Sequence, residues 1–182
     1  AHSNLASFYN RFGRLKLAAE HYRESIVLDS TYGPGYQGLG NLHQRRGDDA
    51  RAARYYLEAL RWDSTLAETH NNLGLLFHKR RELTKALQQY QRAVRFAPEI
   101  AHYHSNLGNI YLELERLTEA EAAVSHAIEL DSTFYSAQIL LGDIHARQGS
   151  YGSAIARWQA VPARGAMKQQ LADKIAAAQK RL

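Results

Sequence analysis

Apolar and small residues recur along the chain with a period of 34 residues. Leucine occupies the same place five times and is always followed by Ala or Gly, as in Leu5–Ala6, Leu39–Gly40, Leu73–Gly74, Leu107–Gly108 and Leu141–Gly142. Within each period, the apolar and small positions return every three or four residues, which is the spacing of one face of an α-helix. A fixed period of this length predicts pairs of helices that stack on one another.

Each period separates small positions from large ones. We number every unit from one to thirty-four, so that position one is occupied by Gly33, Ala67, Ala101 and Tyr135. Position eight is then Ala or Gly, position twenty is Ala in all five units, and position twenty-four is large: Tyr22, Tyr56, Tyr90, Val124 and Trp158. Small residues let helix backbones approach while large side chains interlock around them. We therefore expect a core in which the small positions bring paired helices together.

This pattern resembles the tetratricopeptide repeat (TPR) at its diagnostic positions, over nearly the whole chain. The resemblance implies an all-α fold, a right-handed superhelical solenoid of helix-turn-helix units. We expect five units in residues 1–161, namely 1–32 with a truncated start, 33–66, 67–100, 101–134 and 135–161. Because Ala1 would already lie inside a first helix, we expect the chain to be part of a longer protein.

The C-terminal residues 162–182 predict a helix of another kind. After Pro162, apolar residues follow at spacings of three or four: Met167, Leu171, Ile175, Ala178 and Leu182. The stripe predicts an amphipathic helix that caps the apolar face of the fifth unit, with docking of a partner helix as the alternative.

Turns and junctions carry their own signals. The turn between paired helices contains Gly13, Gly47 or Gly149, but Arg81 and Glu115 replace this glycine in the third and fourth units, so these two turns should be less relaxed. The junctions between units read Asp-Ser-Thr at 29–31, 63–65 and 131–133. We expect these residues to cap the incoming helix.

Composition narrows the function classes. The net charge is +5 and the excess lies between Arg45 and Arg95, mostly on second helices, which favours a solvated outer face over a nucleic-acid site. The absence of cysteine excludes disulfides and thiolate metal sites. Neither a membrane-spanning run nor a signal peptide is visible, and both cytoplasm and periplasm are allowed.

Two apparent chemical motifs fit the repeat instead. Residues Gly33 to Gly38 spell G-x-G-x-x-G, but they fall on a unit junction rather than after a strand. Five of the nine histidines occupy packing positions four and eleven: His2, His70 and His104, and His43 and His145. With no nucleophile–base or phosphate-binding signature, we expect no catalysis, no cofactor and no metal.

The first helices are the best candidates for a binding surface. In TPR arrays these helices line a concave groove, and the resemblance places four asparagines on it: Asn41, Asn72, Asn106 and Asn109. Asparagine gains little from burial and weakens helices, whereas its amide can both donate to and accept from a peptide backbone. The ladder is broken at Gly38 and Leu140, and a solvated groove wall is the alternative. The segments 72–74 and 106–109 look like repeats of O-linked N-acetylglucosamine transferases.

Basic residues follow one edge of the same groove. Arg11, Arg45 and Lys79 share position thirteen, and His78 and His102 add to them from the groove-facing positions twelve and two. They would attract acidic side chains, unless they only place a favourable cation at an exposed helix end.

Together these patterns predict a non-enzymatic protein–protein interaction module that binds an extended or helical peptide segment in its groove. Two alternatives belong to other classes. In the first alternative, the chain is the substrate-recruiting arm of a larger enzyme such as a glycosyltransferase. In the second, it is a scaffold that self-associates through its N-terminal face.

Overall fold

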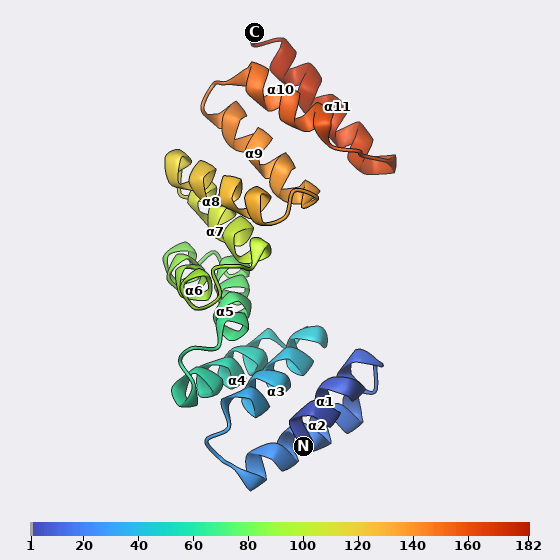
Figure 1. The fold of residues 1–182 in the computed structure, drawn as a ribbon, viewed down its shortest axis with the longest axis vertical. Coiled ribbons are helices and arrows are strands. Elements are labelled where there is room, and N and C mark those ends of the chain that lie inside the picture. Colours follow the sequence, from blue (N-terminus) through green and yellow to red (C-terminus); the bar gives the residue numbers. More distant parts are fainter. Residues whose placement is uncertain (1) are drawn as a thin grey trace. The chain divides into compact units, whose positions relative to one another are not determined.

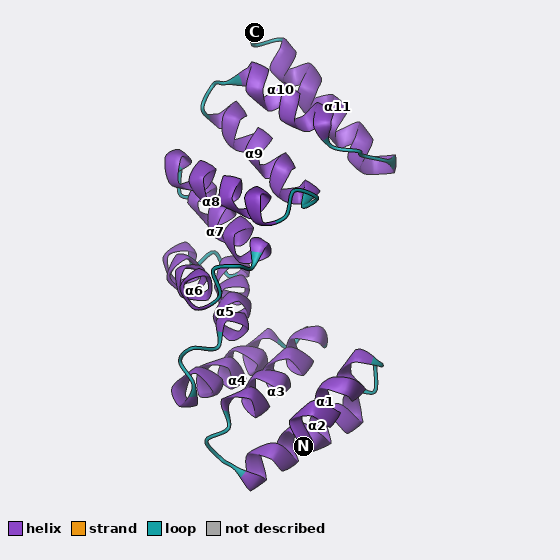
Figure 2. Cartoon of the chain, in the orientation of Figure 1, coloured by secondary structure: helices purple, strands orange, loops and turns teal. Residues whose placement is uncertain are grey.

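The computed structural model describes residues 2–182, and Ala1, which we placed in the first helix, lies outside this range. Within it the chain forms eleven helices and no strand (Figures 1 and 2). The helices are α1 (His2–Arg11), α2 (Leu15–Leu28), α3 (Gly33–Arg45), α4 (Asp49–Trp62), α5 (Ala67–Lys79), α6 (Leu83–Phe96), α7 (Ala101–Glu113), α8 (Leu117–Leu130), α9 (Tyr135–Arg147), α10 (Tyr151–Ala160) and α11 (Gly165–Gln179). The prediction of an all-α chain is confirmed. None of the helices in residues 2–182 is long and apolar enough to span a membrane.

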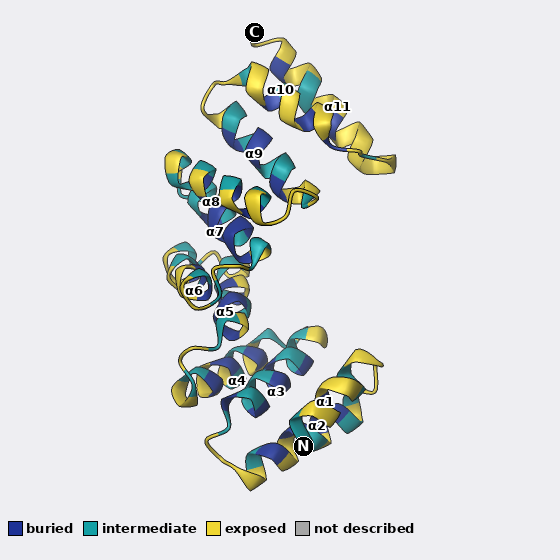
Figure 3. Ribbon diagram, in the orientation of Figure 1, coloured by how far each residue is buried: buried dark blue, intermediate teal, exposed yellow. Residues whose placement is uncertain are grey.

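The helices group into two compact units, Ala1–Phe96 and Ala97–Leu182. The first contains the pairs α1–α2, α3–α4 and α5–α6; the second contains α7–α8, α9–α10 and the final α11. Figure 3 shows that buried residues are frequent along α3, α5 and α7, the first helices of their pairs.

In the second to fifth repeats, the two helices of the pair pack together where a glycine at position eight meets position twenty-four of the same repeat. A Cβ atom added to Gly40 would lie 2.5 Å from the ring of Tyr56, and one added to Gly142 would lie 2.4 Å from the indole of Trp158. In the fourth repeat the same contact joins Gly108 to a Val124 methyl group, at 2.3 Å. The absence of a side chain at position eight therefore provides the space that the large residue fills.

Position twenty completes this core. All five of its alanines are fully buried: Ala18, Ala52, Ala86, Ala120 and Ala154. Helix α11 extends the last core, because Leu171 and Ala178 are buried beside Ala154, Trp158 and Val161. The ends of its apolar stripe are not used in this way, since Met167 and Leu182 are exposed.

The turns inside the pairs adopt the left-handed backbone conformation. Gly13, Gly47 and Gly149 have φ between 73° and 80°, and the non-glycine residues Arg81 and Glu115 follow them at 61° and 58°. This conformation is unfavourable for residues with a Cβ atom. The expected strain in the third and fourth turns is therefore present.

The expectation that the Asp-Ser-Thr junctions cap the incoming helices is wrong. Helix α3 begins at Gly33, and Asp29 lies too far before it to reach its free N–H groups. Instead, Oδ1 of Asp29 accepts hydrogen bonds from the backbone N–H of Thr31 (2.9 Å) and from its hydroxyl (2.7 Å). These two donors hold the pKa of Asp29 below its usual value. Asp63 with Thr65 and Asp131 with Thr133 repeat the arrangement, so the aspartates fold the junction itself.

Position four anchors the next helix to this junction. Its side chain donates to the backbone carbonyl six residues earlier in four successive repeats: Tyr36 to Ser30 (3.0 Å), His70 to Ser64 (3.0 Å), His104 to Pro98 (2.8 Å) and Gln138 to Ser132 (2.7 Å). The histidines at this position therefore have a structural task in these repeats, as their packing position indicated.

Candidate functional site

The predicted groove residues divide between the two compact units. In the first unit Arg11 lies on α1, Asn41 and Arg45 on α3, and Asn72, His78 and Lys79 on α5. In the second unit His102, Asn106 and Asn109 lie on α7. All nine are therefore on first helices, and each unit contributes its own part of the surface.

Asn41 is the centre of a hydrogen-bond network in the first unit. Its Oδ1 lies 2.8 Å from the hydroxyl of Tyr56, which can donate to it or to Oε1 of Gln44 at 2.6 Å. The same Oδ1 accepts from Nδ2 of Asn72, 3.0 Å away on the next first helix. Burial raises the pKa of Tyr56 above its usual value, and the charge of Glu68 adds to the effect, so this hydroxyl stays protonated. Asn41 and Asn72 thus join two repeats directly.

An acidic residue that the sequence analysis missed joins the hydrogen-bond network around Asn41. Glu68, at position two of the third repeat, accepts hydrogen bonds from Nε2 of Gln37 (2.7 Å) and Nδ2 of Asn41 (3.0 Å). Thr69 donates back to Oε1 of Gln37 at 3.0 Å. Glu68 itself is exposed. The sequence shows this acid one repeat away from the two amides, but it does not show that the side chains meet.

Position nine is tied to position twenty-four within a repeat. The hydroxyls of Ser7 and Tyr22 lie 3.1 Å apart, Tyr56 meets Asn41 in the second repeat, and in the fifth Nε1 of Trp158 donates to Asp143 at 3.1 Å. The third and fourth repeats differ, because position nine is Leu75 in the third and position twenty-four is Val124 in the fourth, and neither side chain has a polar atom. The half-buried amide of Asn109 therefore lacks the partner that Asn41 has.

The interruption of the asparagine ladder at Gly38 has a steric cause. A Cβ atom at Gly38 would lie 2.2 Å from the ring of Tyr22, which belongs to the preceding repeat. No side chain fits at this position of the second repeat while Tyr22 keeps its place. The gap in the ladder is thus imposed by packing.

In the second unit the final helix contacts position nine of the last repeat. Nζ of Lys174 on α11 lies 2.5 and 2.6 Å from the two carboxylate oxygens of Asp143 on α9. The ammonium group also lies 5.6 Å from the centre of the Trp158 ring. These three residues line one shallow hollow with Leu112 and Arg181. Asp143, at position nine of the fifth repeat, is therefore already paired with a side chain of the same protein.

The basic residues at position thirteen connect neighbouring repeats. Nη1 of Arg45 donates to the carbonyl oxygen of Asn10 (3.0 Å) and to its Oδ1 (2.5 Å), and Nζ of Lys79 lies 2.5 Å from Asp49. In the second unit Arg147 pairs with Glu115. Each cation thus contacts the repeat before its own, a role that the sequence did not indicate.

The remaining predicted residues differ in their surroundings. Arg11 is exposed at the end of α1. His78 and Lys79 line a shallow hollow with Gln44, Asp49 and Leu75. On α7, the exposed His102 packs edge-to-face on Tyr103, with ring centres 4.4 Å apart, and Asn106 is half-buried.

The fold has known counterparts. The chain matches a solved structure of PilF from Pseudomonas aeruginosa with 20% sequence identity and a TM-score of 0.81, over 100% of this chain and 89% of that one. For PilW, described as a widely conserved type IV pilus biogenesis factor, the values are 19% and 0.84, over 99% and 85%. For YrrB, described as a TPR protein with an unusual peptide-binding site, they are 21% and 0.75, over 100% and 91%.

Comparison at the level of sequence gives a consistent result. A search of curated proteins found no match. Tetratricopeptide-repeat family models match residues 36–65 and 105–166, and a TPR repeat model matches residues 76–115. The helix pairs, their 34-residue phase and these matches together identify the chain as one built of tetratricopeptide repeats.

Proposed function

We propose that the chain is a non-enzymatic interaction module, and that its first helices hold an extended or helical peptide segment. The observation that carries the proposal is the contrast at position nine. The Asn41 amide accepts a hydrogen bond from the buried hydroxyl of Tyr56. Asn109 makes no such bond, because position twenty-four of its repeat is Val124. A half-buried amide with spare donor and acceptor capacity suits a peptide backbone, which offers one of each per residue.

The hydrogen-bond network around Asn41 in the first unit supports the same mode of binding. There Gln37 and Asn41 both direct amide N–H groups at one exposed carboxylate, that of Glu68. The donors are already arranged to hold an acceptor group. A peptide carbonyl can replace the Glu68 oxygens, because hydrogen bonds to an exposed side chain contribute little to stability. The peptide-binding description of YrrB agrees with this use of the fold.

An acidic preference of the partner has less support than backbone binding. Arg45 contacts Asn10, and Lys79 contacts Asp49. Glu68 places a negative charge beside Asn41. Acidic side chains would therefore be attracted mainly near Arg11 at the exposed end of α1. We keep the acidic partner as a proposal for that edge only.

Self-association through α1 is a second candidate, favoured by an apolar patch. The exposed fractions of Leu5, Phe8 and Phe12 are 40%, 54% and 65%, and the two phenylalanine rings lie 4.6 Å apart. Light scattering of the chain and of Phe8→Asp across a range of concentrations tests this candidate. The mass of a monomer at every concentration of the unchanged chain excludes it. A recruiting arm for an enzyme, such as a glycosyltransferase, stays a proposal that no contact in the structure favours.

Selection from a displayed library of random linear peptides tests the main proposal. Peptides selected on the unchanged chain are then measured by fluorescence anisotropy against Asn109→Ala. We expect weaker binding with an unchanged melting temperature. If no peptide is enriched, or if the enriched peptides bind Asn109→Ala equally well, the proposed use of this amide is wrong. The matched control is Gln169→Ala, an exposed amide on α11 that lies outside the first helices.

A further inference from the structure

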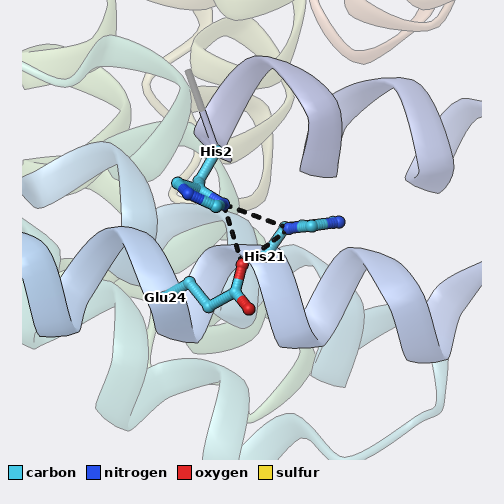
Figure 4. Close-up of side chains that lie close together, drawn as sticks. All are labelled: His2, His21 and Glu24. Carbon is cyan, nitrogen blue, oxygen red and sulfur yellow. Dashed lines mark hydrogen bonds and ion pairs between the residues drawn. The ribbon is translucent and has the colours of Figure 1, made fainter.

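Three potential metal ligands converge between α1 and α2. His2 on α1 faces His21 and Glu24 on α2 (Figure 4). Among residues 2–182, these three side chains form a group whose ligand atoms all lie within 4.8 Å of one another. The set combines two imidazole nitrogens with one carboxylate oxygen, which are typical ligands of divalent first-row transition metals.

The distances within the group fit the coordination of a single ion. Nδ1 of His2 lies 3.2 Å from Nδ1 of His21, and Oε2 of Glu24 lies 2.8 Å from each nitrogen. Zinc binds such atoms at about 2.0–2.2 Å, so neighbouring ligands lie roughly 2.8–3.6 Å apart, from the short end for an octahedral ion to the long end for a tetrahedral one. An ion placed above this triangle of atoms reaches all three without a change of backbone.

Hydrogen bonding alone explains the arrangement less well. In neutral histidine only one ring nitrogen carries a proton. Without a cation, both Nδ1 atoms must carry theirs and direct them at the same oxygen of Glu24. The two protons would then also face each other across the 3.2 Å between the nitrogens, whereas one divalent ion accepts a lone pair from each of the three atoms. The convergence of the three atoms therefore favours a cation at their centre.

The repeat architecture fixes the orientation of these side chains. His2 occupies position four, where the Nδ1 atom of the equivalent His70 faces position twenty-three, at 2.7 Å from Gln89. His21 occupies position twenty-three, and its ring stacks on Tyr9 with centres 5.5 Å apart and planes 6° apart. Glu24 follows His21 by three residues, so both lie on the same side of α2. Ligand positions fixed by packing in this way reduce the loss of side-chain freedom on binding.

The combination of ligands is particular to the first repeat. Positions four, twenty-three and twenty-six of the later repeats hold Tyr36, Tyr55 and Glu58; His70, Gln89 and Arg92; His104, Ala123 and His126; and Gln138, Arg157 and Ala160. None of these sets offers three nitrogen or carboxylate ligands. A packing position that the other repeats use for structure thus has different chemistry at the start of the chain.

We propose that His2, His21 and Glu24 bind a divalent transition-metal ion such as Zn²⁺, which joins α1 to α2. Three protein ligands leave the remaining coordination positions to water, and the partly exposed His2 and Glu24 side chains give the ion access from solvent. Because two ligands lie on α2 and one on α1, bound metal stabilises the first helix pair.

Calorimetric titration with zinc chloride, on the chain without a histidine tag, tests the site. We expect one ion per chain and binding that is at least about tenfold weaker in His21→Ala, since even the loss of an outer-shell partner has effects of that size. Zinc should also raise the melting temperature of the unchanged chain but not that of His21→Ala. Circular dichroism without metal establishes that the variant is folded.

The matched control is His126→Ala on α8. His126 also faces a glutamate three residues later, Glu129, at 3.1 Å, but within residues 2–182 this pair belongs to no group of three ligand atoms that lie within 4.8 Å of one another. Its removal should leave zinc binding unchanged. The proposal is overturned if micromolar zinc does not bind the unchanged chain, if His126→Ala weakens binding equally, or if His21→Ala binds zinc as tightly as the unchanged chain.

Discussion

The hydroxyl of Tyr56 and Oδ1 of Asn41, 2.8 Å apart, join the two helices of the second repeat across its core. Tyr56 is fully buried, so its hydroxyl depends on partners within the protein. This contact turns an asparagine of the predicted ladder into a structural residue. It also separates the asparagines into those that hold the fold, like Asn41, and those, like Asn109, that we propose for peptide binding.

Asn41→Ala and Asn109→Ala should therefore differ in stability although they share position nine. We expect Asn41→Ala to lower the free energy of unfolding by about 0.5–1.5 kcal/mol, because it removes the hydrogen bonds of Asn41 to Tyr56 and Asn72, although Gln44 can still accept from the hydroxyl. Asn109→Ala should change it by less than about 0.5 kcal/mol, as is usual for residues without such a partner. Urea unfolding followed by circular dichroism measures both. Equal losses in the two variants would contradict the assignment.

The contact between positions eight and twenty-four predicts a steric effect. Gly40→Ala should destabilise the chain by about 1–3 kcal/mol, because the new methyl group would lie 2.5 Å from the Tyr56 ring. Gly152→Ala on α10 is the control, since a Cβ atom there meets nothing within 4 Å. That variant should gain roughly 0.5–1 kcal/mol from the better helix propensity of alanine. Thermal melting of both variants measures these changes. If Gly40→Ala is as stable as the unchanged chain, α3 and α4 can move apart at this contact without loss of stability.

The strained turn at Arg81 predicts a stabilising substitution. Arg81→Gly should raise the free energy of unfolding by about 0.5–1 kcal/mol, because the left-handed strain that it relieves exceeds the extra freedom of glycine in the unfolded chain. Gly47→Ala, in the equivalent turn with φ of 76° and no atom near its Cβ, should destabilise by about 1 kcal/mol. Opposite signs in urea unfolding are the expected result. Two changes of the same sign would mean that backbone conformation does not dominate at this turn.

His104 predicts a loss of stability in acid. Burial lowers the pKa of His104 below its usual value of 6.5, the hydrogen bond to Pro98 opposes this shift, and the nearby His126 adds to it. Below that usual value the unfolded chain binds the proton more readily than the folded one, so this contribution to stability is present above it and is lost as the pH falls. His104→Gln should flatten the decrease between neutral pH and mild acid, because Gln138 makes the same bond to its junction without titrating. Melting temperatures across this range measure the difference, and parallel pH profiles would contradict it.

The contacts inside each repeat could be predicted because the repeat phase determines them. Small residues at position eight and large ones at position twenty-four meet at the same place in every unit, so Gly40 and Tyr56 could be assigned to the core from their spacing alone. Contacts between repeats depend on how one helix pair is rotated against the next and on side-chain rotamers. For this reason the sequence did not reveal that Lys79 pairs with Asp49 or that Glu68 holds two amides.

The capping error and the metal-ligand cluster have the same kind of explanation. The residue types at the Asp-Ser-Thr junctions were those of helix caps, but the distance from Asp29 to the start of α3 decided which N–H groups its carboxylate could reach. His2 and His21 belong to different helices, and each taken alone fits a packing position. Their convergence on Glu24 becomes visible only when the two helices of the pair are placed together.

The bond from position four to the junction carbonyl depends on reach and on a donor proton, and the identity of the residue matters little. A phenol, two imidazoles and a carboxamide all make it in successive repeats. Substitutions among these side chains are thus nearly silent for the architecture while they exchange one reactive group for another. A tandem array built on such a rule can accumulate new chemistry at one repeat, and its neighbours keep the fold unchanged.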